Sequence, residues 1–245
     1  MAFENSAFNY FLRQDQKMDA KATDLPRMKL IQLLRGLQPI ASQNQSITMK
    51  RSSFTRYGDT FDSVFENNEK ITLSRADVFK AFSQDPAVGA LKAIAWGFPR
   101  GNRPGGRTLQ AAINAIPFML KQIESPNYLT REIYEKINSL PDVKNGVTTK
   151  LLHFSGITTQ DGHRAQIYDS RIHQYLMHVR PEEYAPLIAT MRPSTSFPSA
   201  DQYLNYLRIT EAVMTGAGYE DPSSVEIYMF TNAPGKRSAR HKSGT

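Results

Sequence analysis

Helical periodicity is the feature that most restricts the fold of this 245-residue sequence. Through the second half of the chain, apolar residues recur at the spacing that places them on one face of a helix. Patterns that alternate apolar and polar residues, as a half-buried strand does, are scarce. The apolar stripes are Leu109, Ala112, Ile113, Ile116 and Ile123; Ile133, Ile137 and Leu140; Ile172, Tyr175, Leu176 and Val179; Tyr184, Leu187, Ile188 and Met191; and Tyr203, Leu204 and Leu207.

These stripes predict a mainly α fold. Residues 74–98 are expected to form two short helices that separate at Asp85–Pro86, and Pro117 is expected to kink or divide the helix that carries Leu109. Residues 45–58 are compatible with one short extended piece, and 224–231 fit either a strand or the end of a helix. We therefore expect a helical domain over residues 73–234, a less regular N-terminal extension over 1–72 packed on it, and a flexible basic tail over 235–245.

Composition excludes several classes of protein. The chain has 40% hydrophobic and 22% charged residues, as globular proteins do, and no apolar run approaches the length of a membrane span. It contains no cysteine, which excludes disulfides, thiolate nucleophiles and cysteine-ligated zinc. The first twenty residues lack the pattern of a secretory signal. We expect an intracellular, monomeric protein that does not associate with membranes.

The formal net charge of +7 is unevenly distributed. Four basic residues lie in the last ten positions. Without them, the net charge from the chain's 30 basic and 23 acidic residues falls to +3. A cationic tail on a mildly basic body suits a polyanion such as nucleic acid, although tails of this kind also serve solubility alone. The four are Lys236, Arg237, Arg240 and Lys242.

Several common chemistries have no support in the sequence. The glycines of residues 97–107, "GFPRGNRPGGR", match neither a phosphate-binding loop nor a dinucleotide fingerprint. No two of the five histidines stand at the helical metal-ligand spacing, and no serine occupies a nucleophile elbow. We expect no metal and no cofactor.

Two segments could contact phosphates. Arg100, Arg103 and Arg107 gather among glycines, and arginine binds phosphate with two parallel hydrogen bonds. The segment "LPDVKNGVTTK" reads as a helix, a tight turn and a second helix, whose N-terminus can point backbone N–H groups at a phosphate. Its contacting residues would be Lys144, Asn145, Gly146 and Val147. A flexible surface loop and a plain helical hairpin are the alternatives.

Lys150 and Asp169 form the candidate catalytic pair. Lys150 is expected in the first turn of the helix after the hairpin, where the helix dipole and burial favour a neutral amine. Asp169 is expected to cap the helix that carries Ile172 and to stay ionised there. Residues 155–166 could return the chain and bring the two together, which would make a nucleophile and a base. Taken singly, the lysine is a solvated cation and the aspartate an ordinary cap.

The hairpin, this lysine and this aspartate together resemble the helix-hairpin-helix DNA glycosylases, in particular the lysine-bearing branch around 8-oxoguanine DNA glycosylase. The resemblance covers residues 129–179 and rests on "TKLLHFSGI" and "AQIYDSRI" in that order. The family hairpin usually reads L-P-G-V-G. Here it is "LPDVKNG", with Asp142 in place of a glycine and a longer turn.

The resemblance implies that the protein binds DNA, flips a modified base into a pocket and excises it. Lys150 would attack C1′ of the deoxyribose and form a Schiff base, which also permits abasic-site lyase activity. Asp169 would stabilise positive charge on the sugar and assist the deprotonation of Lys150. An oxidised purine and a hypermodified base of invading viral DNA, as in antiviral defence, are both compatible substrates. Aromatic residues that could stack on the base are Trp96, Phe98, Phe154 and Tyr168.

Two other functions remain open on the sequence alone. A non-catalytic helical DNA-binding module would use the hairpin and the tail, and it would bind DNA whether or not Lys150 is present. A protein–protein adaptor would show no affinity for DNA even at low salt.

Overall fold

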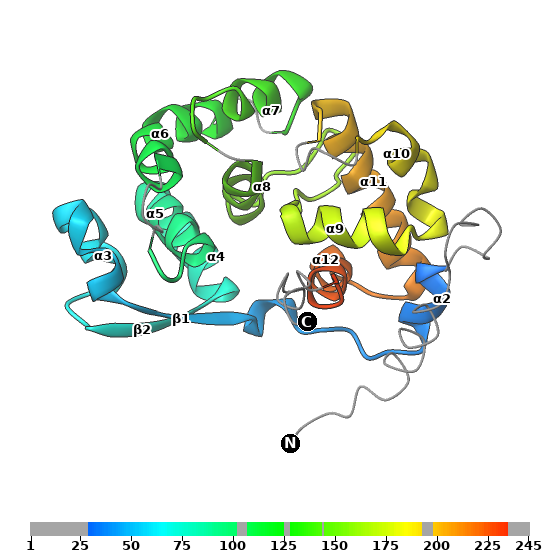
Figure 1. The fold of residues 1–245 in the computed structure, drawn as a ribbon, viewed down its shortest axis with the longest axis horizontal. Helices are drawn as coiled ribbons and strands as arrows, with labels where there is room; N and C mark the ends of the chain where they lie inside the picture. Colours follow the sequence, from blue (N-terminus) through cyan, green and yellow to red (C-terminus); the bar gives the residue numbers. More distant parts are fainter. Residues whose placement is uncertain (1–28, 102–106, 125–127, 144, 193–197, 235–245) are drawn as a thin grey trace, which may run out of the picture.

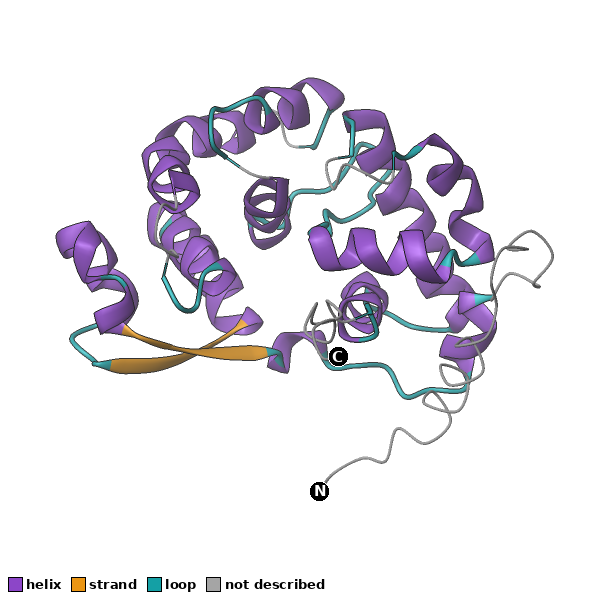
Figure 2. Ribbon diagram, in the orientation of Figure 1, coloured by secondary structure: helices purple, strands orange, loops and turns teal. Residues whose placement is uncertain are grey.

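The computed structural model describes residues 29–101, 107–124, 128–143, 145–192 and 198–234. Lys144 and Arg103, expected to contact DNA, and the basic tail, which suits either DNA or solubility, lie outside these ranges. The described part is mainly α-helical, as the stripes predict, and carries one two-stranded sheet (Figure 2). Its elements are α2 (Leu30–Arg35), β1 (Ser46–Lys50), α3 (Asp62–Phe65), β2 (Lys70–Ser74), α4 (Arg75–Gln84), α5 (Pro86–Gly97), α6 (Arg107–Glu124), α7 (Arg131–Asn138), α8 (Asn145–Phe154), α9 (Ser170–Val179), α10 (Ala185–Thr190), α11 (Ala200–Ala217) and α12 (Pro222–Thr231).

Local signals in the sequence explain where the helices around the site begin. The Ser74 side chain accepts a hydrogen bond from the backbone N–H of Asp77, whose carboxylate bonds back to Ser74, and this capping box opens α4. Asp85 caps α5 by accepting hydrogen bonds from the backbone N–H groups of Ala87 and Val88, and Pro86 fills the first helical position, where it has no hydrogen bond to lose. The predicted break at Asp85–Pro86 is confirmed.

Three local predictions left open are settled by the structure. α6 runs through Pro117 without interruption, so this proline does not divide the helix. Residues 224–231 belong to helix α12, which Asp221 caps, and are not a strand. The short extended piece expected within 45–58 is β1, which pairs antiparallel with β2 in the register Ser46 to Ser74.

Helix α8 lies at the centre of the molecule. Figure 1 shows α4, α5, α6 and α7 as an arc on one side of it, and α9, α11 and α12 on the other. Eight of its ten residues are buried, which makes it a core helix with apolar or hydrogen-bonded side chains on most of its circumference. Only Gly146 and Lys150, one turn apart on the same face, are not buried.

The segment before β2 packs on the helical body through apolar side chains. Leu30 and Leu34 of α2 are buried in the same core as the central helices, and α2 contacts α11. Phe54, Phe61 and Phe65 form a cluster of tilted rings next to the sheet. None of the described helices is both long enough and apolar enough to cross a membrane.

Candidate active site

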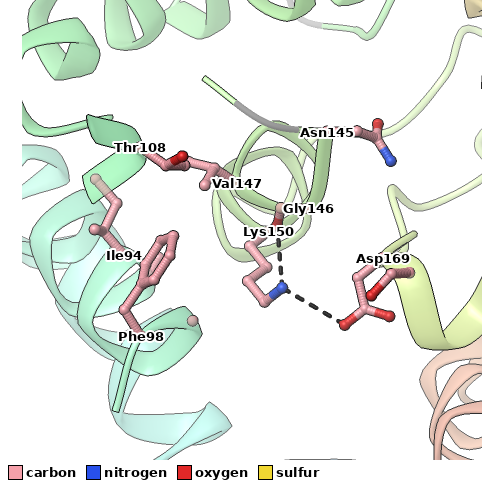
Figure 3. Close-up of a pocket in the computed structure, with 11 residues that line it drawn as sticks. Ile94, Phe98, Thr108, Asn145, Gly146, Val147, Lys150 and Asp169 are labelled. Atoms are coloured by element: carbon pink, nitrogen blue, oxygen red, sulfur yellow. Dashed lines mark hydrogen bonds and ion pairs between the residues drawn. The ribbon is translucent and has the colours of Figure 1, made fainter. Parts of the chain in front are cut away.

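A pocket of about 470 Å³ opens between α5, α8 and the start of α9 (Figure 3). Most of its wall is apolar, and among the described residues one amine and one carboxylate face it. This combination is typical of small-molecule and base-binding sites, which have an apolar lining and a few convergent polar groups. The lining residues are Ala93, Ile94, Gly97, Phe98, Thr108, Asn145, Gly146, Val147, Lys150, Asp169 and Ser170.

Lys150 and Asp169 meet in this pocket. The Lys150 Nζ donates a hydrogen bond to the Gly146 carbonyl oxygen at 3.1 Å and lies 3.8 Å from Asp169 Oδ2. Their side chains are 13% and 18% exposed, so both are largely shielded yet reachable from the pocket. Figure 3 shows the amine directed toward the carboxylate.

The position of Lys150 in its helix differs from the prediction. α8 begins at Asn145, so Lys150 stands in the second turn and not in the first. Side chains on a helix lean toward its N-terminus, and the Lys150 stem follows this direction back to the carbonyl of Gly146. The amine therefore lies beside the first turn although its Cα does not.

Asp169 is the N-cap of α9, as predicted. Its Oδ1 accepts hydrogen bonds from the backbone N–H groups of Arg171, at 2.8 Å, and Ile172, at 3.2 Å. These bonds orient the carboxylate and leave Oδ2 free to face Lys150. The chain reaches this point because residues 155–166 fold back, with the Ala165 N–H bonded to the Ile157 carbonyl.

Two glycines leave room for the lysine. A Cβ atom at Gly97 would come within 3.1 Å of Lys150 Cδ. One at Gly146 would lie 3.4 Å from the Asp169 Cβ and 3.6 Å from the Lys150 Nζ. The close approach of α5 and α8 thus depends on residues without side chains.

The hairpin between α7 and α8 accommodates the substitution that sets it apart from the family pattern. Asp142 has a φ of 59°, in the left-handed region that glycine adopts readily and aspartate tolerates. Its side chain is exposed. The turn therefore keeps a conformation suited to glycine with an acidic residue in its place.

The Asn145 side chain is bonded inside the protein, whereas the DNA contact expected of this segment uses backbone N–H groups and stays a prediction. Asn145 is 2% exposed; its Oδ1 accepts a hydrogen bond from the Tyr134 hydroxyl, and its Nδ2 donates one to the Tyr168 carbonyl, both at 2.7 Å. These bonds anchor the first turn of α8. Gly146 and Val147 line the pocket.

Of the four aromatic residues expected to stack on a base, only Phe98 lines the pocket. Trp96, Phe154 and Tyr168 are core residues: Trp96 packs edge-on against Phe154, and Tyr168 is fully buried with its hydroxyl 3.0 Å from His173 Nδ1. Burial raises the pKa of the Tyr168 hydroxyl above its ordinary value, so it stays protonated.

Arg100 and Arg107 are exposed, and neither lines the pocket. They flank residues 102–106 and lie close in sequence to Phe98 and Thr108, which do line it. Sequence reasoning missed Ala93, Ile94, Gly97, Thr108 and Ser170. The only signal for any of them is adjacency to a candidate residue, which holds for Gly97 before Phe98, Thr108 after Arg107 and Ser170 after Asp169. Within the described ranges, no group of three or more acidic or histidine side chains could hold a metal ion.

Comparison with known proteins agrees with this geometry. The chain matches, over residues 41–230, the family described as "Putative 8-oxoguanine DNA glycosylase OGG-like protein". No significant match is found among curated proteins or solved structures. The match begins within the segment expected to be an N-terminal extension and spans most of the chain, including every residue that lines the pocket. The protein therefore belongs to the family of 8-oxoguanine DNA glycosylase-like proteins.

Proposed function

We propose that this protein excises a modified base from DNA and that Lys150 is the nucleophile. The observation that carries the proposal is the convergence of Lys150 and Asp169 in one pocket, 3.8 Å apart, in a chain of this family. An amine beside a fixed carboxylate is a nucleophile with its base. A base flipped out of the duplex would enter the apolar part of the pocket, where Phe98 can stack on it.

The reaction would start from the neutral amine, which forms when the Lys150 ammonium group gives a proton to Asp169. The Lys150 nitrogen forms a bond to C1′, the glycosidic bond breaks, and the base leaves with the bonding electrons and takes up a proton. Opening of the sugar ring then gives the Schiff base. Loss of a C2′ proton with departure of the 3′ phosphate is the lyase step, which we propose as an accompanying activity.

The family favours an oxidised purine as the substrate. A hypermodified base of viral DNA, as in antiviral defence, is the second candidate. Both substrates imply a protein that works inside the cell. The pocket offers few side chains to read the edge of a base, because Asn145 is already bonded to Tyr134 and Tyr168. Among the described residues, the hydroxyl groups of its lining are those of Thr108 and Ser170.

Borohydride trapping tests the proposal. The protein is incubated with single strands and duplexes that contain 8-oxoguanine, a glucosylated hydroxymethylcytosine or an abasic site, and base release and covalent adducts are scored. Wild type should release one of the two bases and form an adduct on the abasic strand. Lys150→Gln should bind DNA and form no adduct, whereas Lys121→Gln, an exposed lysine of α6, should behave as wild type.

Three outcomes would refute the assignment in different ways. Adduct formation by Lys150→Gln at the wild-type rate would show that another group is the nucleophile. Salt-dependent binding without release of any base would indicate a non-catalytic DNA-binding module. Absence of binding at low salt would indicate a protein–protein adaptor.

A further inference from the structure

Arg75, the first residue of α4, is an arginine in the core. It is 1% exposed, and its guanidinium makes hydrogen bonds in three directions. Nη2 donates to Glu226 Oε2 at 2.6 Å, Nε donates to Gln45 Oε1 at 2.7 Å, and Nη1 lies 3.2 Å from His153 Nε2. The guanidinium carbon also stands 5.3 Å from the centre of the Trp96 ring.

The contact with His153 is a hydrogen bond to a neutral ring. The Nδ1 of His153 lies 2.8 Å from the Ala165 carbonyl, which can only accept, so Nδ1 carries the proton and Nε2 accepts from Arg75. Burial lowers the pKa of His153 to about 3, and the charge of Arg75 acts in the same direction. The ring is thus held neutral and in one tautomer. Its bond to the Ala165 carbonyl connects α8 to the segment that leads to Asp169.

Two of these partners stand next to residues that line the pocket. Trp96 directly precedes Gly97 in α5, and His153 follows Lys150 by one turn in α8. Gly97 and Lys150 approach closely, so that a Cβ at Gly97 would lie only 3.1 Å from Lys150 Cδ. Arg75 therefore holds the two helices together directly behind the place where the lysine stem passes between them.

The third partner connects Arg75 to the other half of the site. Glu226 is 1% exposed on α12, which packs against α9, the helix that Asp169 caps. The Arg171 side chain strengthens this contact, since its Nε and Nη2 donate to the carbonyls of Phe230 and Ala233. Figure 1 shows α8, α9 and α12 grouped at the centre of the molecule.

We propose that Arg75, paired with Glu226, positions Lys150 and Asp169 relative to each other. This inference rests on the proposed function. Arg75 touches neither residue of the pair; it acts through His153 and Trp96 on the lysine side, and through Glu226 and α12 on the aspartate side. Arg75 thereby sets the separation of the amine and the carboxylate, and their cooperation depends on this distance.

A buried ion pair is a costly way to obtain stability. Removing two charges from water costs several kcal/mol per ion, and apolar residues of similar size often stabilise a protein as much or more. Burial raises the pKa of Glu226, and its pairing with Arg75 opposes that rise. The charge of Asp169 raises the pKa of Glu226 further, and that of Lys150 lowers it.

The decisive variant is Arg75→Met/Glu226→Leu, which removes both charges together and leaves no buried ion without a partner. Its exposed counterpart, Arg131→Met/Asp201→Asn, removes a surface ion pair and is the control. The thermal midpoint reports folding, affinity for a duplex with a stable abasic-site analogue reports binding, and single-turnover borohydride trapping on abasic DNA reports the covalent step. The carbon-13 signal of dimethylated Lys150, assigned by its absence in Lys150→Gln, reports the surroundings of the amine in the free protein.

If Arg75 positions the site, the double variant folds and binds DNA within about threefold of wild type, but traps at least about tenfold more slowly. The Lys150 signal shifts, and the control changes none of these readouts. A folded double variant with a trapping rate within about twofold of wild type and an unmoved signal overturns the inference.

Should the double variant not fold, Arg75→Lys decides by the same criteria. It keeps the charge opposite Glu226 but cannot reach His153 and Gln45 at once. If wild type forms no adduct with any DNA, the proposed function fails. The Lys150 signal then still shows whether Arg75 controls the position of the amine, so the two failures are distinguishable.

Discussion

Replacement of Gly97 by alanine should raise stability and lower activity at the same time. Gly97 is the last residue of α5, and its backbone does not have a positive φ. Alanine there favours the helix over the unfolded chain by roughly 0.5 kcal/mol, about half the value for a helix interior. The new methyl group, however, points at Lys150 and would lie 3.1 Å from its Cδ.

The size of the effect on catalysis follows from that distance. Carbon atoms without a bond between them pack at about 3.5–4.0 Å, so the lysine stem must shift by roughly 0.5 Å. A misplacement of about 1 Å can cost roughly a hundredfold in rate, and a shift of half that size should slow adduct formation by about tenfold. The stem is flexible and partly exposed, so the fold absorbs the contact at little cost.

Denaturation in urea and single-turnover trapping on abasic DNA measure the two effects separately. Gly36→Ala is the matched control, because its Cβ would meet the Leu33 carbonyl at an ordinary 3.6 Å, far from the pocket. It should leave the trapping rate unchanged. Trapping by Gly97→Ala at the wild-type rate would refute the claim that α5 holds Lys150 in place. A stability loss larger than about 1 kcal/mol would show that the contact is not confined to the lysine stem.

Substitutions at three further residues test other parts of the molecule. Asp169→Asn keeps an effective N-cap, so it should change the free energy of unfolding by less than about 0.5 kcal/mol while slowing trapping about a hundredfold. Asp169→Ala should slow trapping and also lose about 1 kcal/mol of stability, because the cap is removed. Equal trapping rates for Asp169→Asn and wild type would contradict the role of Asp169 as the base. Asp142→Gly should stabilise the protein against urea by roughly 0.5 kcal/mol, because its φ of 59° suits glycine, and a loss would speak against strain in this turn. The pKa of His153 is lowered to about 3 in the folded protein from its ordinary value of 6.5. Below pH 6.5 the unfolded chain therefore takes up a proton that the folded protein does not, so the free energy of unfolding decreases as the pH is lowered. The loss from this group at pH 5 is about 2 kcal/mol, and His153→Gln should lose correspondingly less between pH 7.5 and 5; subtraction cancels other groups such as Glu226, and identical losses would contradict the assignment.

Features governed by neighbours in sequence could be predicted from the sequence. The caps at Asp85 and Asp169 bond to N–H groups two or three residues ahead, so the residue type and its place before an apolar stripe suffice. The pairing of Lys150 with Asp169 was also foreseen, from the order of the hairpin, lysine and aspartate. The residue at which α8 begins could not be predicted. Its first turn is held by buried hydrogen bonds of Asn145 to the Tyr134 hydroxyl and the Tyr168 carbonyl, and no local pattern in the sequence indicates either bond.

Burial on every side hides a helix from periodicity. In α12, eight of ten residues are buried, so no stripe distinguishes one face, and the segment reads equally well as a strand. Glu226 lies within this helix, where its partner Arg75 is 151 positions away. No spacing rule connects them.

The sequence by itself determined that the chain is helical, where several helices begin, and which lysine and aspartate belong together, because these follow from local hydrogen bonds and from the order of motifs. Only the tertiary structure decided which side chains face the pocket. Trp96 and Phe98 are two residues apart, yet one packs in the core and the other lines the site. The direction of a side chain depends on what packs against its helix, and for α5 this includes α8, about fifty residues further along the chain.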